Sequence, residues 1–235
     1  MRQKLLQMTG ALGLLLALGT AAFLLGRNEG QASGPFIVNS TDDTDDADFG
    51  GVFDGVCDDG TGQCTLRAAI EEANASVGVA DTINFAISTV PKTIAPGSSL
   101  PIITDPVTID GTTQSCCVEL DGLNAGYPTT GVGLKITAGG STVRGLIIVR
   151  FGDYGIELGT LGGNVIQGNY IGTDAAGAAD LGNGSTGIMV YGSPSNTIGG
   201  AGAGEGNVIS GNGSDGIYIG AHPAPLGGTR WWVTA

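Results

Sequence analysis

The chain has 235 residues, which is enough for one sizeable domain and short for two. It carries 44 glycines, yet 41% of its residues are hydrophobic and only 13% are charged, which excludes a disordered polyelectrolyte. The formal net charge is −13 and the whole chain has nine Lys and Arg, so no basic patch is available for phosphates and nucleic acid is excluded as a partner.

Residues 1–32 are predicted to be a secretion signal. A positively charged start is followed by an apolar run over 11–25 and then by small residues, which is the pattern of a signal peptide. An uncleaved membrane anchor is the alternative, because mostly apolar sequence extends over 5–26. In either case we expect a secreted or cell-surface protein, which contacts a membrane only through this segment and only if the segment is uncleaved.

An acidic leading segment is predicted over 33–64. It holds eight aspartates between positions 41 and 60 and no Lys or Arg. We interpret it as a solvated loop, as charge runs usually are. A Ca²⁺ site is the alternative, since clustered carboxylates offer the hard oxygen ligands that Ca²⁺ prefers, although the spacing does not match an EF-hand loop. The candidate ligands are Asp42, Asp43, Asp45 and Asp46, and we expect no other cofactor.

Cys57 and Cys64 close this segment. In an exported protein, two cysteines around so short a loop are predicted to form a disulfide. A zinc site would need two more ligands, and the adjacent Cys116 and Cys117 are poorly placed to complete a tetrahedron. The adjacent pair itself is open between buried small hydrophobes and a second disulfide.

One amphipathic helix is predicted over 65–75. Thr65 can cap its start, and Glu71, Glu72 and Asn74 are expected to face away from the structure. The apolar residues at helical spacing on its other face are Leu66, Ala69, Ile70 and Ala73. Such a short helix needs a surface to cover.

Short β-branched runs separated by Gly, Asp or Pro occupy 76–220. The phrase Gly-apolar-x-apolar recurs at 133–136, 155–158, 187–190 and 216–219, and the shortest interval between starts runs from 133 to 155. A second phrase alternates with it, as in GNVIQGN at 163–169 and GNVISGN at 206–212. These coupled repeats predict an all-β solenoid, a parallel β-helix of about six turns in which inward Ile and Val stack.

The two ends of this predicted solenoid differ. An open end would expose the core and unpaired strand edges, so the helix over 65–75 is predicted to act as a cap. The segment 221–235 abandons the repeat and is predicted to be irregular. A plug formed by Trp231 and Trp232 and a truncated C-terminus are the two interpretations of that segment.

Two stretches resemble a known group of proteins. Residues 36–85, with Cys-Thr-Leu-Arg-Ala-Ala at 64–69, resemble the N-terminal module of secreted bacterial proteins that is named for its C-S-L-R-E-A motif. Here Thr and Ala replace the Ser and Glu of that name. Residues 164–188 and 196–212 resemble the right-handed parallel β-helix repeats that commonly follow this module. The resemblance implies a single-stranded right-handed β-helix and export, and it implies no established activity.

Carbohydrate chemistry is the enzymatic hypothesis, because right-handed β-helices include polysaccharide lyases and hydrolases. Arg144, Arg150 and Asp153 are the lyase candidates within the repeats, but a surface ion pair within 150–153 is the simpler interpretation. A hydrolase needs two carboxylates at a defined separation. The carboxylates of the repeats are too dispersed to nominate a pair: Asp153, Glu157, Asp174, Asp180 and Asp215. We therefore name no catalytic residue.

The asparagines of the repeated phrase allow two interpretations. They can present amides to a sugar, or they can occupy turns and bond to the chain one repeat away, as a structural ladder. Because each lies next to glycine and follows the repeat, we favour the ladder. The residues are Asn164, Asn169, Asn207 and Asn212.

The sequence thus favours an exported scaffold or adhesin, with weak glycan binding along one face, over a polysaccharide lyase or glycoside hydrolase. Aromatic residues make up only 6% of the chain and are spread along it, which argues against an enzyme groove. The expected partners are extracellular polysaccharide or cell-surface components.

Overall fold

The computed structural model describes residues 35–48, 54–115, 117–127 and 130–220, and all of these lie in one unit, Ala32–Ala235. The predicted signal over 1–32 and the segment 221–235 lie outside the described residues. Among the residues that are described, no helix is both long enough and apolar enough to span a membrane.

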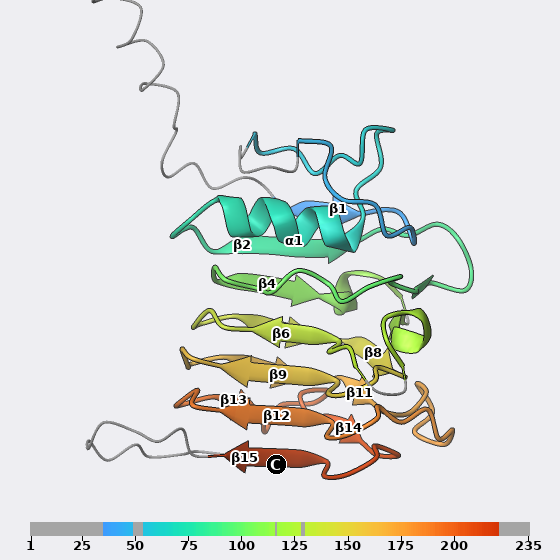
Figure 1. Ribbon diagram of the computed structural model, residues 1–235, viewed down its shortest axis with the longest axis vertical. Coiled ribbons are helices and arrows are strands. Elements are labelled where there is room, and N and C mark those ends of the chain that lie inside the picture. Colours follow the sequence, from blue (N-terminus) through green and yellow to red (C-terminus); the bar gives the residue numbers. More distant parts are fainter. Residues whose placement is uncertain (1–34, 49–53, 116, 128–129, 221–235) are drawn as a thin grey trace, which may run out of the picture. The chain divides into compact units, whose positions relative to one another are not determined.

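Short strands in three parallel sheets make up most of the structure (Figure 1). Sheet A contains, in spatial order, β1 (Phe36–Val38), β2 (Asp81–Phe85), β4 (Val107–Asp110), β7 (Thr142–Arg144), β10 (Val165–Gln167) and β13 (Thr197–Ile198). Sheet B contains β3 (Thr93–Ile94), β5 (Val118–Asp121), β8 (Leu146–Val149), β11 (Tyr170–Ile171) and β14 (Val208–Ile209). Sheet C contains β6 (Leu134–Ile136), β9 (Ile156–Gly159), β12 (Ile188–Tyr191) and β15 (Ile217–Gly220).

The chain adds strands to the sheets in a repeating order. From β4 onward, every three consecutive strands contribute one strand each to sheets A, B and C. Before them come β2 in sheet A, β3 in sheet B and an isolated parallel bridge from Ile103 to Ile136 of sheet C. The span 81–220 therefore contains five such sets, where the repeat length predicts about six. The difference arises because some connections are longer than the shortest repeat, as between the starts of β4 and β7 at 107 and 142.

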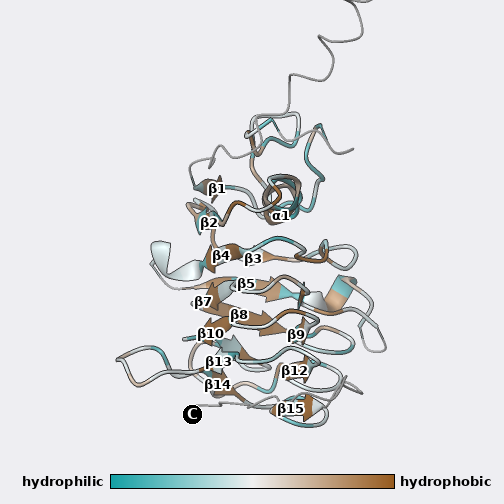
Figure 2. Ribbon diagram, turned by 90° about the vertical axis from the view of Figure 1, so that its left-hand side faces the viewer, coloured by the Kyte–Doolittle hydropathy of each residue, from teal (hydrophilic) through white to brown (hydrophobic). Residues whose placement is uncertain are grey.

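Inward-facing side chains form the core because successive residues of a strand point to opposite faces. The parallel register then places equivalent apolar residues of neighbouring strands directly side by side. The main column of sheet A is Ile83, Ile109, Val143, Ile166 and Ile198. Sheet C has two columns. One begins with Leu134, Ile156 and Ile188, and the other begins with Ile136, Leu158 and Val190. All of these side chains are buried in one hydrophobic cluster, and most strands are accordingly brown in Figure 2.

At one end of this core lies α1 (Leu66–Ala75), beside β1 and β2 (Figure 1). Thr65 is its N-cap, as predicted, and the Thr65 Oγ1 accepts a hydrogen bond from Ala68 N at 3.0 Å. The apolar face of the helix belongs to the same hydrophobic cluster as the strands, through Leu66 and Ile70 among others. Two 3₁₀ helices complete the described elements, η1 (Gly111–Thr113) and η2 (Gly122–Asn124).

The last strand of sheet C ends this arrangement with its apolar residues uncovered. Ile217 and Ile219 continue the columns of Ile188 and Val190. Their exposed fractions are 36% and 39%, whereas those of Ile188 and Val190 are 0% and 2%. Within the described ranges, β15 pairs with β12 along one edge and has no strand on the other.

Candidate functional site

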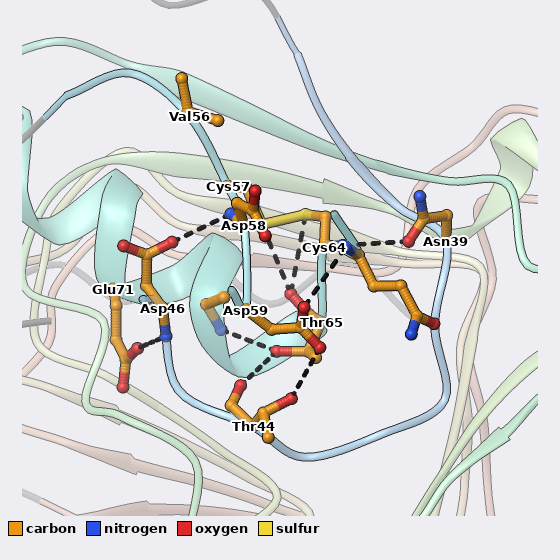
Figure 3. The surroundings of a disulfide bond; sticks show 12 residues. Asn39, Thr44, Asp46, Val56, Cys57, Asp58, Asp59, Cys64, Thr65 and Glu71 are labelled. Atoms are coloured by element: carbon orange, nitrogen blue, oxygen red, sulfur yellow. Dashed lines mark hydrogen bonds between the residues drawn. A yellow bond between two sulfur atoms is a disulfide. The ribbon is translucent and has the colours of Figure 1, made fainter. Parts of the chain in front are cut away.

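The Asp-rich segment is joined to the start of α1 by a disulfide between Cys57 and Cys64 (Figure 3). The two Cα atoms are 5.1 Å apart. Beside the disulfide, the Thr65 hydroxyl donates a hydrogen bond to the carbonyl oxygen of Thr44 at 2.6 Å. The disulfide and this hydrogen bond therefore both hold the Asp-rich segment against the start of α1. Cys117 is also disulfide-bonded, so the described cysteines include no free thiol.

Arg67, the arginine of the Cys-Thr-Leu-Arg-Ala-Ala stretch at 64–69, binds the same segment to the helix. Its Nε and Nη2 atoms donate to the two carboxylate oxygens of Asp43 at 2.9 and 3.0 Å. Its Nη1 and Nη2 atoms also donate to the carbonyl oxygens of Ser99 and Ser98, at 3.2 and 3.3 Å. This bidentate pair of the buried Arg67 with the half-buried Asp43 joins the acidic segment, the helix and residues 98–99.

The prediction that Glu71 and Glu72 face away from the structure is wrong, because both are buried. Glu71 Oε2 accepts a hydrogen bond from Asp46 N at 2.7 Å (Figure 3), and Glu72 Oε2 accepts one from Gly55 N at 3.3 Å. The acidic segment passes over this side of α1, and its backbone N–H groups need acceptors there. The interpretation of the segment as a solvated loop holds for most of its aspartates, among them the exposed Asp42, Asp45 and Asp48, but not for Asp46, which is buried.

The two glutamates have unusual acidity for this reason. Burial raises the pKa of Glu71 to about 7, and the nearby charge of Asp45 acts in the same direction. Burial raises the pKa of Glu72 to about 8, with further contributions from the charges of Asp46 and Asp54. Near neutral pH each therefore carries a proton for part of the time.

The four candidate Ca²⁺ ligands are Asp42, Asp43, Asp45 and Asp46, and the structure gives them separate roles. The carboxylate of Asp43 forms an ion pair with the guanidinium group of Arg67. The two carboxylate oxygens of Asp46 accept the backbone N–H groups of Asp58 and Asp48, at 3.0 and 3.2 Å. In the described part of the chain, no group of three or more His, Cys, Asp or Glu side chains is arranged to hold a metal ion.

The asparagines of the repeated phrase bond to neighbouring strands, as a structural ladder requires. Asn169 is fully buried, and its Oδ1 accepts a hydrogen bond from Leu146 N at 3.0 Å. Its Nδ2 donates to Val143 O at 3.0 Å and to Asn207 Oδ1 at 3.1 Å. One amide thus connects three successive sets of strands.

These asparagines fall into three ladders rather than one. The hydrogen-bonded pairs are Asn164 with Asn196, Asn169 with Asn207, and Asn183 with Asn212. Asn183 and Asn196 were missed by sequence reasoning because neither lies in an N-V-I phrase. The signal that finds them is an asparagine one repeat away in the chain, at 212 for the first and at 164 for the second.

The two copies of N-V-I-x-G-N are not equivalent in the structure. The first contains β10 of sheet A, whereas the second contains β14 of sheet B. In each copy the first asparagine lies directly before the strand, at a turn that we call a corner. The phrase therefore marks a corner, and it does not identify which sheet follows.

The lyase candidates Arg144 and Arg150 lie in ion pairs between adjacent strands. Arg144 pairs with Asp110, and Arg150 Nε donates to Asp121 Oδ1 at 2.9 Å. The expected ion pair of Arg150 with Asp153 is wrong, because the register aligns the end of β8 with the end of β5 and so brings Asp121 to Arg150. Burial of Asp110 opposes its ionisation, but the hydrogen bond from Arg144 prevails and holds the pKa of Asp110 below its usual value.

The outward side of sheet C collects aromatic side chains that are far apart in the sequence. One row, in register across four strands, consists of Lys135, Glu157, Met189 and Tyr218. In the next row Tyr191 lies between Gly159 and Gly220. Tyr191 and Tyr218 are each 47% exposed. We call Lys135, Glu157, Met189, Tyr191 and Tyr218 the sheet C face.

The two tyrosine rings meet over a glycine. A Cβ atom at Gly220 would lie 3.1 Å from ring atoms of both Tyr191 and Tyr218, and Gly220 is itself buried. The absence of a side chain there lets the rings lie close to the strand. Sequence reasoning missed this pair because it treated the aromatic residues as dispersed. The available signal was that Tyr218 occupies the x position of the Gly-apolar-x-apolar phrase at 216–219 and that Tyr191 directly follows the phrase at 187–190.

The other end of the sheet C face is polar. Lys135 Nζ lies 2.9 Å from Glu157 Oε1. Burial raises the pKa of Asp153, and the charge of Glu157 adds to the effect. Burial also raises the pKa of Tyr154, followed by the charges of Asp153 and Glu157. These groups offer hydrogen bonds beside the tyrosines, and the carboxylate of Glu157 is neutralised by its lysine partner.

Comparison with models of known protein families finds no match for this chain, and no curated protein matches it significantly.

Proposed function

We propose that this chain is an exported, single-stranded, right-handed parallel β-helix whose N-terminal end is capped by α1. The repeating order of strands in sheets A, B and C supports this architecture. The strong preference for right-handed connections between parallel strands supports the hand. The proposal includes the relationship of 36–85 to the C-S-L-R-E-A module, and with it secretion or display at the cell surface.

The protein acts in this proposal as a non-catalytic scaffold or adhesin. The observation that carries it is that all five Lys and Arg side chains of the described residues are engaged within the structure. They are Arg67, Lys92, Lys135, Arg144 and Arg150. A lyase needs a basic group free to remove a proton, and a hydrolase needs two carboxyl groups facing one bond. Each basic side chain of the described residues has a partner of its own, which supports the scaffold over a lyase.

Weak glycan binding belongs to the same proposal, with extracellular polysaccharide or cell-surface glycans as the partners. The sheet C face supports it, because exposed aromatic rings there lie next to hydrogen-bonding groups.

Incubation of the purified protein with acidic and neutral polysaccharides, with and without Ca²⁺, tests the scaffold. We expect no new reducing ends and no ultraviolet-absorbing unsaturated products, together with retardation of the protein in gels that contain a bound polysaccharide. Turnover would overturn the scaffold and favour a polysaccharide lyase or hydrolase. An Arg150→Gln variant that abolished such turnover would then assign the base.

A further inference from the structure

We propose that the outward side of sheet B binds an amino-sugar oligosaccharide, with Glu119 pairing with an ammonium group and Tyr170 stacking on a sugar ring. This inference rests on the proposed glycan binding, and it adds a second surface and the chemical class of its ligand.

Five outward residues lie side by side on five adjacent strands of sheet B. We call them the sheet B row: Thr93 on β3, Glu119 on β5, Ile147 on β8, Tyr170 on β11 and Val208 on β14. The residues that follow them, such as Leu120 and Ile148, belong to the hydrophobic cluster, so alternation along each strand directs the row outward. Ile147 is nevertheless buried, whereas Glu119 and Tyr170 on either side of it are partly exposed.

Glu119 is a half-buried carboxylate without a cationic partner. It accepts a hydrogen bond from the Thr93 hydroxyl group at 3.5 Å, and no Lys or Arg within the described ranges forms an ion pair with it. The charge of Arg150 acts on Glu119, but the Arg150 guanidinium group is already bonded to the carboxylate of Asp121. Burial raises the pKa of Glu119, the charge of Asp121 adds to this effect, and the charge of Arg150 opposes it. A cationic group of a ligand beside Glu119 would therefore stabilise its ionised form.

Charge selects a cationic ligand for this surface. Glu119, Asp121 and Arg150 together carry two negative charges and one positive charge, and the chain has a net charge of −13. Both attract a cation. A polyuronate would bring further carboxylates to Glu119, and a neutral glycan would cover the Glu119 carboxylate without balancing its charge. Among glycans, an amino sugar supplies the missing ammonium group.

The apolar part of the row matches the other property of a sugar ring. The C–H groups on one side of a pyranose are apolar, and the face of an aromatic ring such as that of Tyr170 carries partial negative charge. Ile147 and Val208 flank Tyr170 on the neighbouring strands. Tyr170 lies two strands away from Glu119, so about 10 Å separates their backbones across the sheet. One sugar ring does not span that distance, so the ligand is an oligosaccharide that lies across the strands.

Isothermal titration with a glucosamine pentamer and an N-acetylglucosamine pentamer tests the inference, because the two share one skeleton and only the first carries ammonium groups. Oligogalacturonate and pentalysine are the further probes. A mildly acidic buffer of low ionic strength keeps the sugar amines protonated and limits screening.

The test variants are Glu119→Gln and Tyr170→Ala. Glu205→Gln is the matched control, because Glu205 is also half-buried but lies outside every strand of the described residues. Thermal melting shows whether each variant is folded. If Tyr170→Ala does not fold, Glu119→Gln carries the test, since it keeps the size of the side chain and removes only its charge.

We expect the wild type to bind the glucosamine pentamer about tenfold more tightly than the N-acetylated pentamer. Glu119→Gln should reduce this preference to within about threefold, and Tyr170→Ala should weaken the binding of both pentamers, while the control keeps the preference. A wild type without the preference, a Glu119→Gln variant that retains it, or a Tyr170→Ala variant with unchanged affinity would overturn the site. Equally tight binding of pentalysine, or tighter binding of oligogalacturonate, would overturn the amino-sugar class.

The proposed glycan binding is tested separately by the retardation experiment. A wild type that is retarded by another polysaccharide but does not bind the glucosamine pentamer would overturn this inference alone. A wild type that binds none of the sugar probes and is not retarded by any polysaccharide would overturn both.

Discussion

Asn169 is a buried amide on which three sets of strands depend. It satisfies the backbone N–H of Leu146 and the carbonyl oxygen of Val143, and both of those residues are fully buried. Water cannot replace these hydrogen bonds without opening the structure. A buried amide in this position therefore stabilises the corner more than an exposed asparagine in a turn would.

The change Asn169→Ala tests this. We expect the free energy of unfolding in urea to fall by about 2–4 kcal/mol, because two buried backbone groups lose their partners. The control is Asn124→Ala in the exposed part of η2, with an expected change within about 0.5 kcal/mol. If Asn169→Ala kept its stability and lost glycan binding, the structural ladder would be the wrong interpretation.

Glu71 and Glu72 give the stability of the protein an unusual dependence on pH. Their folded-state pKa values, about 7 and about 8, exceed the ordinary value of 4.5, so the folded protein binds these protons more tightly than the unfolded chain does. The resulting stabilisation is fully present below pH 4.5 and is lost as the pH rises through the folded-state values.

Glu72→Gln should remove the larger part of this effect, since the amide keeps an acceptor for Gly55 N and carries no charge. We expect the melting temperature of the variant to exceed that of the wild type above about pH 8, and the difference to shrink towards about pH 5. Glu205→Gln serves as the control. A variant that was equally destabilised at every pH would contradict the protonation of Glu72.

At the scale of elements, α1 joins the acidic segment to the core. Its apolar face contacts β1 and β2, while its other side provides Arg67, Glu71 and Glu72 to the segment above it. The start of the helix has two further attachments, the disulfide at Cys64 and the hydroxyl of Thr65. The helix is therefore covered on both sides, although it is only ten residues long.

Thr65→Ala should destabilise this attachment by about 1–2 kcal/mol, because the helix loses its cap and Thr44 O loses its donor. Thr65→Ser keeps both hydrogen bonds and should retain most of the stability. Chemical denaturation followed by circular dichroism measures both. Equal losses in the two variants would assign the effect to the methyl group and not to the hydroxyl.

At the scale of the whole molecule, the two ends of the described core differ. Near the N-terminus, α1 covers the apolar columns, whereas at β15 the side chains of Ile217 and Ile219 remain exposed. This exposure is confined to the end of the sheet, because the residues of the same columns on β12, Ile188 and Val190, are buried.

A matched pair of lysine substitutions measures this difference. Val190 and Ile219 are partners in the register of β12 and β15, with exposed fractions of 2% and 39%. Val190→Lys should lower the free energy of unfolding by more than about 3 kcal/mol, and Ile219→Lys by less than about 1 kcal/mol. Equal losses would mean that another part of the protein covers Ile219.

Much of the local structure follows from the sequence. The helix, its cap at Thr65 and the strands of the Gly-apolar-x-apolar phrase depend on neighbouring residues only, and the structure contains them. The burial of Glu71 and Glu72 depends instead on the path of the acidic segment, which precedes the helix in the chain and folds back over it. Helical periodicity carries no information about that path, so it placed both glutamates on a solvent-facing side.

The sequence by itself determined the type of element, the positions of the corners and the inward placement of Ile and Val, because each depends on local spacing. Only the tertiary structure decided which residues meet across strands. The pairs that it brings together from distant parts of the chain include Arg150 with Asp121, Asn183 with Asn212 and Tyr191 with Tyr218. The connections between strands differ in length, so a repeat read along the chain does not fix the register across it. Parallel pairing fixes that register, and with it the sheet C face.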